Sequence, residues 1–461
     1  MVELVILLLV AGLLARTWFV QGLIVPFIVP GGSMAQTLLG LHRDVACEDC
    51  GCRFTCGADA RPVAARAVCP NCGCRQNHLE SQPNVAGDRV LVDKSAFHLR
   101  PPRRWEIVAF RHPDQPSMCC VKRVVGLPGE SVQIRHGDVY TKGKSQAARE
   151  IQRKSLPIQR AMALPVHDAN CRPSSEPPLP PRWRSDDPHT QWGSAEGRFT
   201  HPAATSPESI DWLTYHHWRR LPGPAGGVVE SPVMDVYGYN QTRPRRVEAI
   251  SPVGDLLLSF RLVKLAGGGR LWVRASDGRE EFYVRIDGSE LCYQVFRNAQ
   301  EGQPVAQGTL ADRSEDLRVE LSLFDQQLVL GFGGRTASEC PYEPADGRPR
   351  PTSRPFAIGC EGPEVEIRDL RVFRDVYYTH TVGVDGRWGL DRPVQLAEDE
   401  YFVLGDNSPI SEDSRTWPGG PGVPAKSLIG KPLVVHFPSR RIDWGSWHFQ
   451  VPDPAKIRYI R

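Results

Sequence analysis

The amino-acid sequence predicts a mainly β protein built from several domains. Its 461 residues are enough for about two to four domains. The 41 prolines and 42 glycines favour strands, tight turns and irregular connections over long helices. Short runs of β-branched residues, separated by Pro, Gly and Asp, recur along the chain, and this pattern is typical of antiparallel strands.

The N-terminal residues 1–20 are strongly apolar and are expected to form a transmembrane anchor. Leu4–Leu14 carries no charge, Trp18 suits a membrane interface, and Arg16 would have to extend its guanidinium to that interface. A cleaved signal peptide and a buried core helix are alternatives, because 11 uninterrupted apolar residues fall short of the roughly 20 that span a bilayer. No Lys or Arg precedes Arg16, so we expect either that an upstream segment is missing or that the start is placed too late.

Two stretches with strand character, 21–46 and 79–140, are expected to form the first two parts of one β core. A third part with similar character covers 377–461. A domain inserted into this core explains the long interval between its second and third parts. The clearest strands expected in the second part are Arg89–Val92, Trp105–Phe110, Cys119–Val125 and Ser131–Ile134.

The interval between the second and third parts, residues 141–376, contains two regions of different composition. Residues 141–245 are polar and proline-dense and are expected to be a Pro-rich linker or loosely ordered insert. Residues 246–376 alternate apolar and polar side chains between regularly spaced turns, which predicts a β-sandwich. The run Val365–Val372 resembles the closing strand of concanavalin-like jelly rolls, so the sandwich is expected to be jelly-roll-like.

Ser33 and Lys122 lie in two short motifs whose residue types suit a Ser/Lys pair. Ser33 stands in Val29–Met34, after the apolar segment, and Lys122 stands in Val121–Glu130. A serine hydroxyl is a weak nucleophile until a base takes its proton, and lysine can act as that base where burial keeps its amine partly neutral. Taken alone, a Ser beside glycines is usually a turn residue, and a Lys-Arg pair is usually a solvated surface. The β-branched neighbours that would bury the lysine stem are Val121, Val124 and Val125.

Four motifs together resemble the bacterial type I signal peptidases of the S26 family, and they occur in the order that family has. These motifs are Gly31–Met34, Gly87–Lys94, Val121–Glu130 and Gly405–Asn407. The resemblance implies a membrane-bound serine endopeptidase, a hydrolase that removes signal peptides from exported preproteins after small residues of the Ala-x-Ala type. It further implies a single-pass protein of the cytoplasmic membrane with its catalytic domain on the extracytoplasmic side. Its partners would be signal peptides and membrane lipid.

The resemblance assigns roles to individual residues. It implies Ser33 as nucleophile, Lys122 as general base, and no cofactor for catalysis. Ser411 would orient the lysine amine, and Asp413 with Arg415 would support the site as an acid–base pair. The Ser33 amide and position 31 would form the oxyanion site. The residues expected to line shallow apolar substrate pockets are Phe27, Val29 and Val121.

Three positions depart from the family pattern. Gly31 stands where many relatives have a Ser or Thr whose hydroxyl helps to bind the oxyanion, and losing such a donor can cost roughly 3 kcal/mol. Gln36 stands where proline is usual, and Glu130 replaces the commoner Asp. None of these changes removes a catalytic group, so we expect an active enzyme.

Seven of the 13 cysteines fall within 47–78, which predicts a small Cys-rich insert resembling a zinc ribbon. Two Cys-x-x-Cys pairs enclose 18 residues, and each continues to a Cys-Gly-Cys tripeptide. Four thiolates at this spacing suit a structural Zn²⁺ ion, whereas disulfides are the alternative in an oxidising compartment. A net charge of +3, together with Glu48 and Asp49 in the first pair, argues against nucleic-acid binding. The expected ligands are Cys47, Cys50, Cys69 and Cys72.

Other functional classes remain open from the sequence. The chain could be a membrane-anchored protein whose β-sandwich binds glycan, cell-wall material or a protein, with a relict protease core. Trp272, Tyr283 and Tyr293 would then stack on sugars, although aromatic residues in strands are more often buried. A cytosolic self-cleaving Ser/Lys repressor fits less well, because the N-terminus is apolar and no DNA-binding unit is evident.

Overall fold

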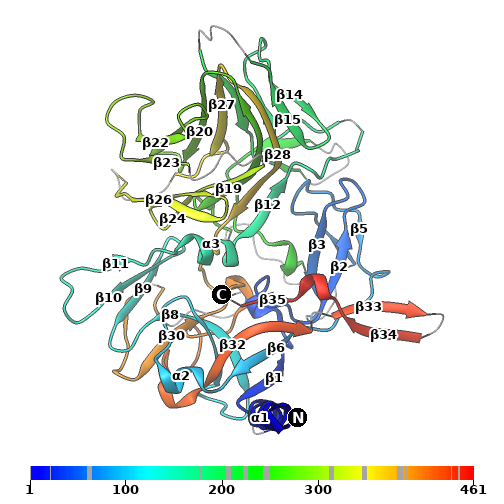
Figure 1. Cartoon of the computed structure of the whole chain (residues 1–461), viewed down its shortest axis with the longest axis vertical. Coiled ribbons are helices and arrows are strands. Elements are labelled where there is room, and N and C mark those ends of the chain that lie inside the picture. The colour runs from blue at the N-terminus through cyan, green and yellow to red at the C-terminus, as the bar shows by residue number, and fades with distance from the viewer. Residues whose placement is uncertain are drawn as a thin grey trace.

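A computed structural model of the chain consists mainly of antiparallel strands, which confirms the predicted mainly β class (Figure 1). The sandwich occupies one end of the molecule, and the core that carries Ser33 and Lys122 occupies the other. The structure describes residues 2–20, 22–59, 65–176, 178–203, 209–221, 227–241, 250–310, 316–344, 350–381, 388–390, 392–437, 439–444 and 447–460.

The N-terminal segment is helical, as α1 (Val2–Ala15) continued by the π-helical turn η1 (Arg16–Val20). No side chain of α1 is buried. In the described part of the chain, no helix combines the length and apolar character that crossing a membrane requires. The predicted transmembrane anchor at 1–20 is therefore not supported, and its uniformly apolar part ends where Arg16 begins the π-helical turn.

The core is an antiparallel sheet in which strands from both ends of the chain are neighbours. Its order is β1-β6-β32-β7-β8-β30-β31, with β35 attached to β32. The pairing of β8 with β30 joins 119–126 to 400–404 across the whole insert. The bounds are β1 Ile24–Ile28, β6 Arg89–Asp93, β7 Ile107–Arg111, β8 Cys119–Gly126, β30 Glu400–Leu404, β31 Val423–Pro424, β32 Leu428–Phe437 and β35 Arg458–Tyr459.

A second, four-stranded sheet connects the core to the insert. It has the order β11-β10-β9-β29, and α3 (Leu156–Met162) follows it. Its bounds are β9 Ser131–Arg135, β10 Asp138–Lys142, β11 Glu150–Ile151 and β29 Val394–Gln395.

The insert contains two larger antiparallel sheets that share one buried core. Leu258 and Ile367 from the first sheet meet Val273 and Val284 from the second sheet in that core. The first sheet has the order β14-β15-β28-β19-β24-β25-β26, with β12 also paired to β28, and the second has the order β13-β16-β27-β20-β21-β22-β23. Their bounds are β12 Leu164–Asp168, β13 Trp183–Arg184, β14 Gly193–Ala195, β15 Arg198–His201, β16 Asp211–Tyr215, β19 Leu256–Ala266, β20 Arg270–Ser276, β21 Glu281–Asp287, β22 Cys292–Arg297, β23 Ala306–Thr309, β24 Leu317–Phe324, β25 Gln327–Phe332, β26 Arg335–Pro341, β27 Phe356–Glu361 and β28 Glu364–Arg374.

This arrangement corrects the boundary predicted between linker and sandwich. The stretch 141–245, predicted as a Pro-rich linker, contributes β12 and β15 to one sheet and β13 and β16 to the other. These strands are two to five residues long and lie between prolines, so their alternation is too short to read. Three of them, β12, β15 and β16, pair with β28 or β27, which lie more than a hundred residues further along the chain.

The three aromatic residues considered for sugar stacking are buried. Trp272, Tyr283 and Tyr293 expose 3%, 9% and 4% of their surface. Tyr293 belongs to the core between the two sheets, while Trp272 and Tyr283 pack in a separate cluster with Phe296. Their place in the fold is that of packed aromatic residues, and glycan binding stays an untested prediction.

The Cys-rich insert forms two small hairpins beside the core. They consist of β2 with β3 and of β4 with β5. The bounds are β2 His42–Ala46, β3 Arg53–Gly57, β4 Arg66–Ala67 and β5 Asn77–His78. The remaining elements are η2 Gly32–Met34, α2 Ala96–Leu99, β17 Trp218–Arg220, β18 Val228–Glu230, η3 Gly238–Asn240, η5 Ser408–Ile410, η6 Ala425–Ser427, β33 Ser439–Trp444, β34 Trp447–Pro452 and η7 Pro454–Lys456.

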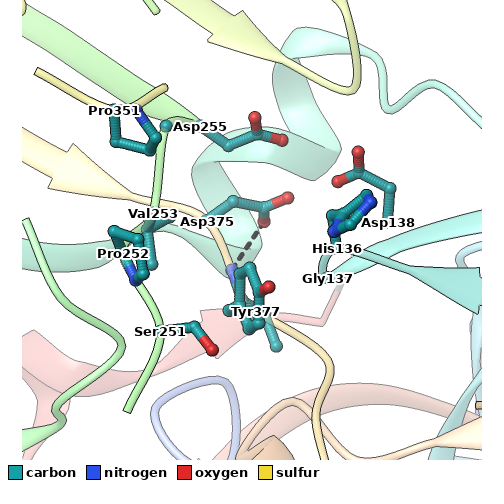
Figure 2. Close-up of a pocket in the computed structure, with 12 residues that line it drawn as sticks. His136, Gly137, Asp138, Ser251, Pro252, Val253, Asp255, Pro351, Asp375 and Tyr377 are labelled. Atoms are coloured by element: carbon teal, nitrogen blue, oxygen red, sulfur yellow. Dashed lines mark hydrogen bonds between the residues drawn. The ribbon is translucent and has the colours of Figure 1, made fainter. Parts of the chain in front are cut away.

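A cavity of about 220 Å³ lies where the small sheet meets the sandwich (Figure 2). Asp138, Asp255 and Asp375 line it, and Figure 2 shows their carboxylates in the space between the two parts. Lys154 is the buried cation beside them, with its Nζ atom 2.5 Å from Asp325 and 2.8 Å from Asp375. Burial raises the pKa of Asp375 to about 6, although Lys154 acts in the opposite direction. This junction therefore holds more acidic groups than the nearby cation balances.

Candidate active site

Lys122 lies on β8, in the middle of the core sheet, where the sequence predicts a buried lysine. Its strand pairs with β7 through Val108 and with β30 through the neighbouring Val124. The lysine exposes only 4% of its surface. Burial lowers the pKa of Lys122 below its ordinary value of 10.5, although Asp413 acts to raise it. The β-branched strand thus provides the environment in which a neutral amine is accessible.

Ser411 is the side-chain partner of this lysine. The Lys122 Nζ atom donates a hydrogen bond of 3.0 Å to the Ser411 Oγ atom. Ser411 follows η5 and is fully buried. Two residues 289 positions apart therefore form one contact, and the pairing of β8 with β30 makes it.

Gly405 brings Ser33 to the same place. A Cβ atom built on Gly405 would lie 2.2 Å from the Ser411 Oγ atom and 2.5 Å from the Ser33 carbonyl oxygen. Ser33 and Ser411 therefore flank one glycine, which must lack a side chain for both to approach. Among the described residues, no hydrogen bond joins the Ser33 hydroxyl to Lys122, whose bonded partner is Ser411.

Asp413 and Arg415 form a buried pair behind the lysine. The Arg415 Nε and Nη2 atoms each donate to one Asp413 carboxylate oxygen at 2.8 Å, and both side chains are fully buried. The Gly405 amide donates to the same carboxylate at 3.0 Å. Burial alone would raise the pKa of Asp413, but Arg415 outweighs it, so the pKa lies below 3.8. The Asp413 carboxylate thus stands near Lys122 and fixes the backbone at Gly405.

Arg123 forms a second buried pair that the sequence did not reveal. Its Nε and Nη2 atoms donate to the two Asp406 carboxylate oxygens at 2.8 and 2.7 Å. Thr37 donates its hydroxyl to the same carboxylate at 2.5 Å. In the sequence, Asp406 stands out only as part of the motif Gly405–Asn407, because a sequence does not show which distant cation an acid faces. The pair fastens β8 to the loop that carries Ser411.

The predicted oxyanion position, Gly31, and two of the predicted pocket residues, Phe27 and Val29, lie in the segment that precedes Ser33. Gly31 has an extended backbone (φ −116°, ψ 165°), and among the described residues a Cβ atom there would meet only one atom within 4 Å, at Asp59. These residues therefore leave room for a side chain at position 31. Val29 is buried, and Phe27 and Val121 pack against the same apolar cluster. The structure brings the three predicted pocket residues together, while their role in binding stays a prediction.

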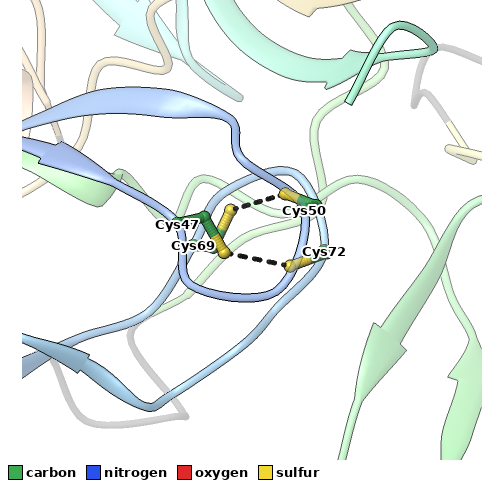
Figure 3. Close-up of side chains that lie close together, drawn as sticks. All are labelled: Cys47, Cys50, Cys69 and Cys72. Atoms are coloured by element: carbon green, nitrogen blue, oxygen red, sulfur yellow. Dashed lines mark hydrogen bonds between the residues drawn. The ribbon is translucent and has the colours of Figure 1, made fainter. Parts of the chain in front are cut away.

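The four predicted metal ligands converge in the Cys-rich insert (Figure 3). The sulfur atoms of Cys47 and Cys72 are 3.5 Å apart, and those of Cys50 and Cys69 are 3.7 Å apart. All four side chains are buried. The two Cys-x-x-Cys segments form turns of the same kind. In the first turn the Gly51 amide donates to the Cys47 carbonyl, and in the second the Gly73 amide donates to the Cys69 carbonyl, both at 2.9 Å.

The donor set fits tetrahedral zinc better than disulfides. With Zn–S bonds of about 2.3 Å, the sulfur atoms of a tetrahedral site lie roughly 3.8 Å apart. A disulfide needs sulfur atoms about 2.05 Å apart. All four ligand atoms lie within 4.8 Å of one another, as one ion requires.

Parts of the chain are similar to known signal peptidases. Residues 76–172 and 358–437 match the family model described as "Signal peptidase, peptidase S26". Signal peptidase I of Leptolyngbya laminosa is 41% identical over 73 residues, which are 14% of this chain and 36% of that protein. Signal peptidase I V of Bacillus subtilis is 36% identical over 61 residues, covering 13% of this chain and 35% of that protein. The matched region spans about a third of the length of these relatives.

Over these residues the chain is similar to peptidases. Within that class, the similarity is to the bacterial type I signal peptidases, the family that its motifs resemble. Among solved structures, the chain is similar to a carbohydrate binding module, CBM66 from Bacillus subtilis. The superposed part covers 42% of this chain and 95% of the module. Its sequence identity is 7% and its TM-score is 0.26. A likeness this low says nothing about what the sandwich binds.

Proposed function

We propose that this protein is a Ser/Lys endopeptidase that removes signal peptides from exported preproteins after small residues. One observation carries the proposal: a buried lysine with a lowered pKa, bonded to Ser411, lies beside the glycine that Ser33 contacts. The relationship to signal peptidases supports the substrate class.

In the proposed reaction, neutral Lys122 takes the proton of the Ser33 hydroxyl as that oxygen attacks the scissile carbonyl. The Ser33 amide donates to the developing oxyanion, and protonated Lys122 returns its proton to the leaving amine. Water then hydrolyses the acyl-enzyme with Lys122 again acting as base. Ser411 orients the amine, and the Asp413–Arg415 pair holds the backbone at Gly405. The walls formed by Phe27, Val29 and Val121 would admit small side chains and exclude large ones.

The cleavage assay uses a preprotein whose signal ends in Ala-x-Ala. Wild-type protein should release the mature product, and Ser33→Ala and Lys122→Ala should each abolish release. Activity that persists in both variants would refute the dyad. A preprotein with Phe in place of the Ala before the cut is the matched substrate control and should not be cleaved. We further propose that the enzyme works at the cytoplasmic membrane with its catalytic part outside, where signal peptides emerge.

The four converging cysteines are proposed to hold a structural zinc ion. Cys47, Cys50, Cys69 and Cys72 would supply four thiolates, and the ion would tie the two hairpins of the Cys-rich insert together. Metal analysis by mass spectrometry, combined with thiol counting, tests this. One zinc ion per chain is expected, with loss of zinc in Cys69→Ser. A protein without zinc and without free thiols would instead indicate disulfides.

A further inference from the structure

Residues 237–241 of the insert, which follow β18 and contain η3, contact the loop that carries Ser33. Tyr239 is fully buried, and its ring presses so closely on the nucleophile loop that a Cβ atom on Gly32 would lie 2.2 Å from it. The ring lies against Gly57 of the Cys-rich insert in the same way, at 2.7 Å. Gln241 donates to the Val68 carbonyl at 3.0 Å, which anchors the far end of the segment.

Asn240 forms a reciprocal pair with Asn407. The Asn240 Nδ2 atom donates to the Asn407 Oδ1 atom, and the Asn407 Nδ2 atom donates to the Asn240 Oδ1 atom, each at 2.8 Å. The second hydrogen of the Asn407 amide goes to the Gly32 carbonyl at 2.9 Å. The Asn407 backbone amide donates to the Ser33 carbonyl at 3.0 Å. Asn407 therefore holds the nucleophile on both sides, and Asn240 fixes the orientation of the Asn407 side chain.

The Gly32 carbonyl and the Ser33 N–H belong to one planar peptide unit and point in opposite directions. A hydrogen bond that holds this carbonyl therefore also sets the direction of the Ser33 N–H, which is the proposed oxyanion donor. Such a donor acts on charge that develops in the transition state, so its orientation affects kcat more than substrate affinity.

We propose that Asn240, supplied by the insert, is a positioning residue that aims the oxyanion-binding amide of Ser33 through Asn407. This inference rests on the proposed peptidase function. It makes the insert a component of the active site, because a residue outside the motifs at 29–34, 121–130 and 405–407 completes the geometry of the nucleophile loop.

Steady-state cleavage of the Ala-x-Ala preprotein by the full chain tests the proposal. Asn240→Ala should lower kcat by about tenfold or more and leave KM within about twofold. Asn240→Asp keeps the acceptor for the Asn407 amide but loses the donor, so its kcat should lie between those of Asn240→Ala and wild type. Asn170→Ala removes an exposed asparagine of the sandwich that bonds to Asp369, so it is the matched control and should keep the wild-type kcat.

A double-mutant cycle separates positioning from general support of the fold. If Asn240 acts through Asn407, then adding Asn240→Ala to Asn407→Ala should cause no further loss of kcat. An additive loss, a change confined to KM, or an unchanged kcat would each overturn the proposal. If Asn240→Ala does not fold, Asn240→Asp alone and in the cycle gives the same decision. Ser33→Ala is measured in parallel. If the wild type cleaves the preprotein and Ser33→Ala does not, the proposed peptidase function is supported whatever the result for Asn240.

Discussion

Replacing Gly405 with alanine should disable the site without removing any group that takes part in the proposed reaction. The new Cβ atom would lie 2.5 Å from the Ser33 carbonyl oxygen and 2.2 Å from the Ser411 hydroxyl, whereas ordinary contacts begin at 3.4 Å. The Ser411 hydroxyl can rotate, but the Ser33 oxygen is backbone and also accepts the Asn407 amide. To restore an ordinary contact, the Ser33 carbonyl would have to retreat by about 0.9 Å.

A displacement of about 1 Å at a reacting group can reduce the rate roughly 100-fold. We therefore expect kcat/KM for the Ala-x-Ala preprotein to fall about 100-fold in Gly405→Ala. Gly268→Ala is the matched control and should cleave like wild type, since Gly268 lies in a turn of the sandwich and no atom of the described residues is within 4 Å of its Cβ position. If Gly405→Ala keeps kcat/KM within about twofold of wild type, the packing of Ser33 against Ser411 does not position the nucleophile.

Further predictions address protonation, buried charge and metal. Because burial lowers the pKa of Lys122, kcat/KM should rise with pH and reach a plateau below pH 10.5. Lys122→Arg stays protonated and should be inactive at every pH. Residual activity in this variant would contradict the role of Lys122 as general base. Asp413→Asn leaves Arg415 buried without its counter-charge, so urea unfolding should show a loss of about 3 kcal/mol, whereas Asp316→Asn in an exposed pair should change nothing measurable. Burial and neighbouring acids raise the pKa of Asp138, so the folded state binds its proton more tightly than the unfolded state and stability falls as pH rises past 3.8. Asp138→Asn should accordingly raise the unfolding temperature at pH 8 and change it little at pH 4; an equal shift at both values would exclude the charge as the cause. A zinc chelator such as 1,10-phenanthroline should lower the unfolding temperature of wild type and leave Cys69→Ser unaffected, and an unchanged wild-type temperature would argue against the ion.

The sequence predicted the parts of the site that reside in local motifs. The strand that buries Lys122 could be recognised from its β-branched residues, and the two cysteine turns could be recognised from their spacing. In both cases the residues that create the environment are neighbours in the chain. The resemblance to a family also placed Ser411 and Asp413 with the correct partners in space, although the roles of these residues in catalysis stay predictions.

What the sequence could not supply were contacts between distant segments. The Arg123–Asp406 pair joins residues 283 positions apart, and nothing next to either residue indicates the other. The strands at 164–168 and 198–201 were hidden because each is too short to show alternation and is stabilised by β28. Asn240 was missed for the same reason, since its significance depends entirely on a residue 167 positions away.

The pairing of β12 with β28 bears on the order in which the molecule can fold. Without the insert in place, joining β8 to β30 means closing a loop of well over two hundred residues, and the entropy cost of closure grows with loop length. In the folded sandwich, Leu164 in its first strand pairs with Arg374 in its last strand. A folded insert therefore shortens the connection between the two halves of the core sheet to the few dozen residues on either side. The core sheet should close late, after the sandwich, so that Lys122 meets Ser411 only in a chain whose insert is already complete.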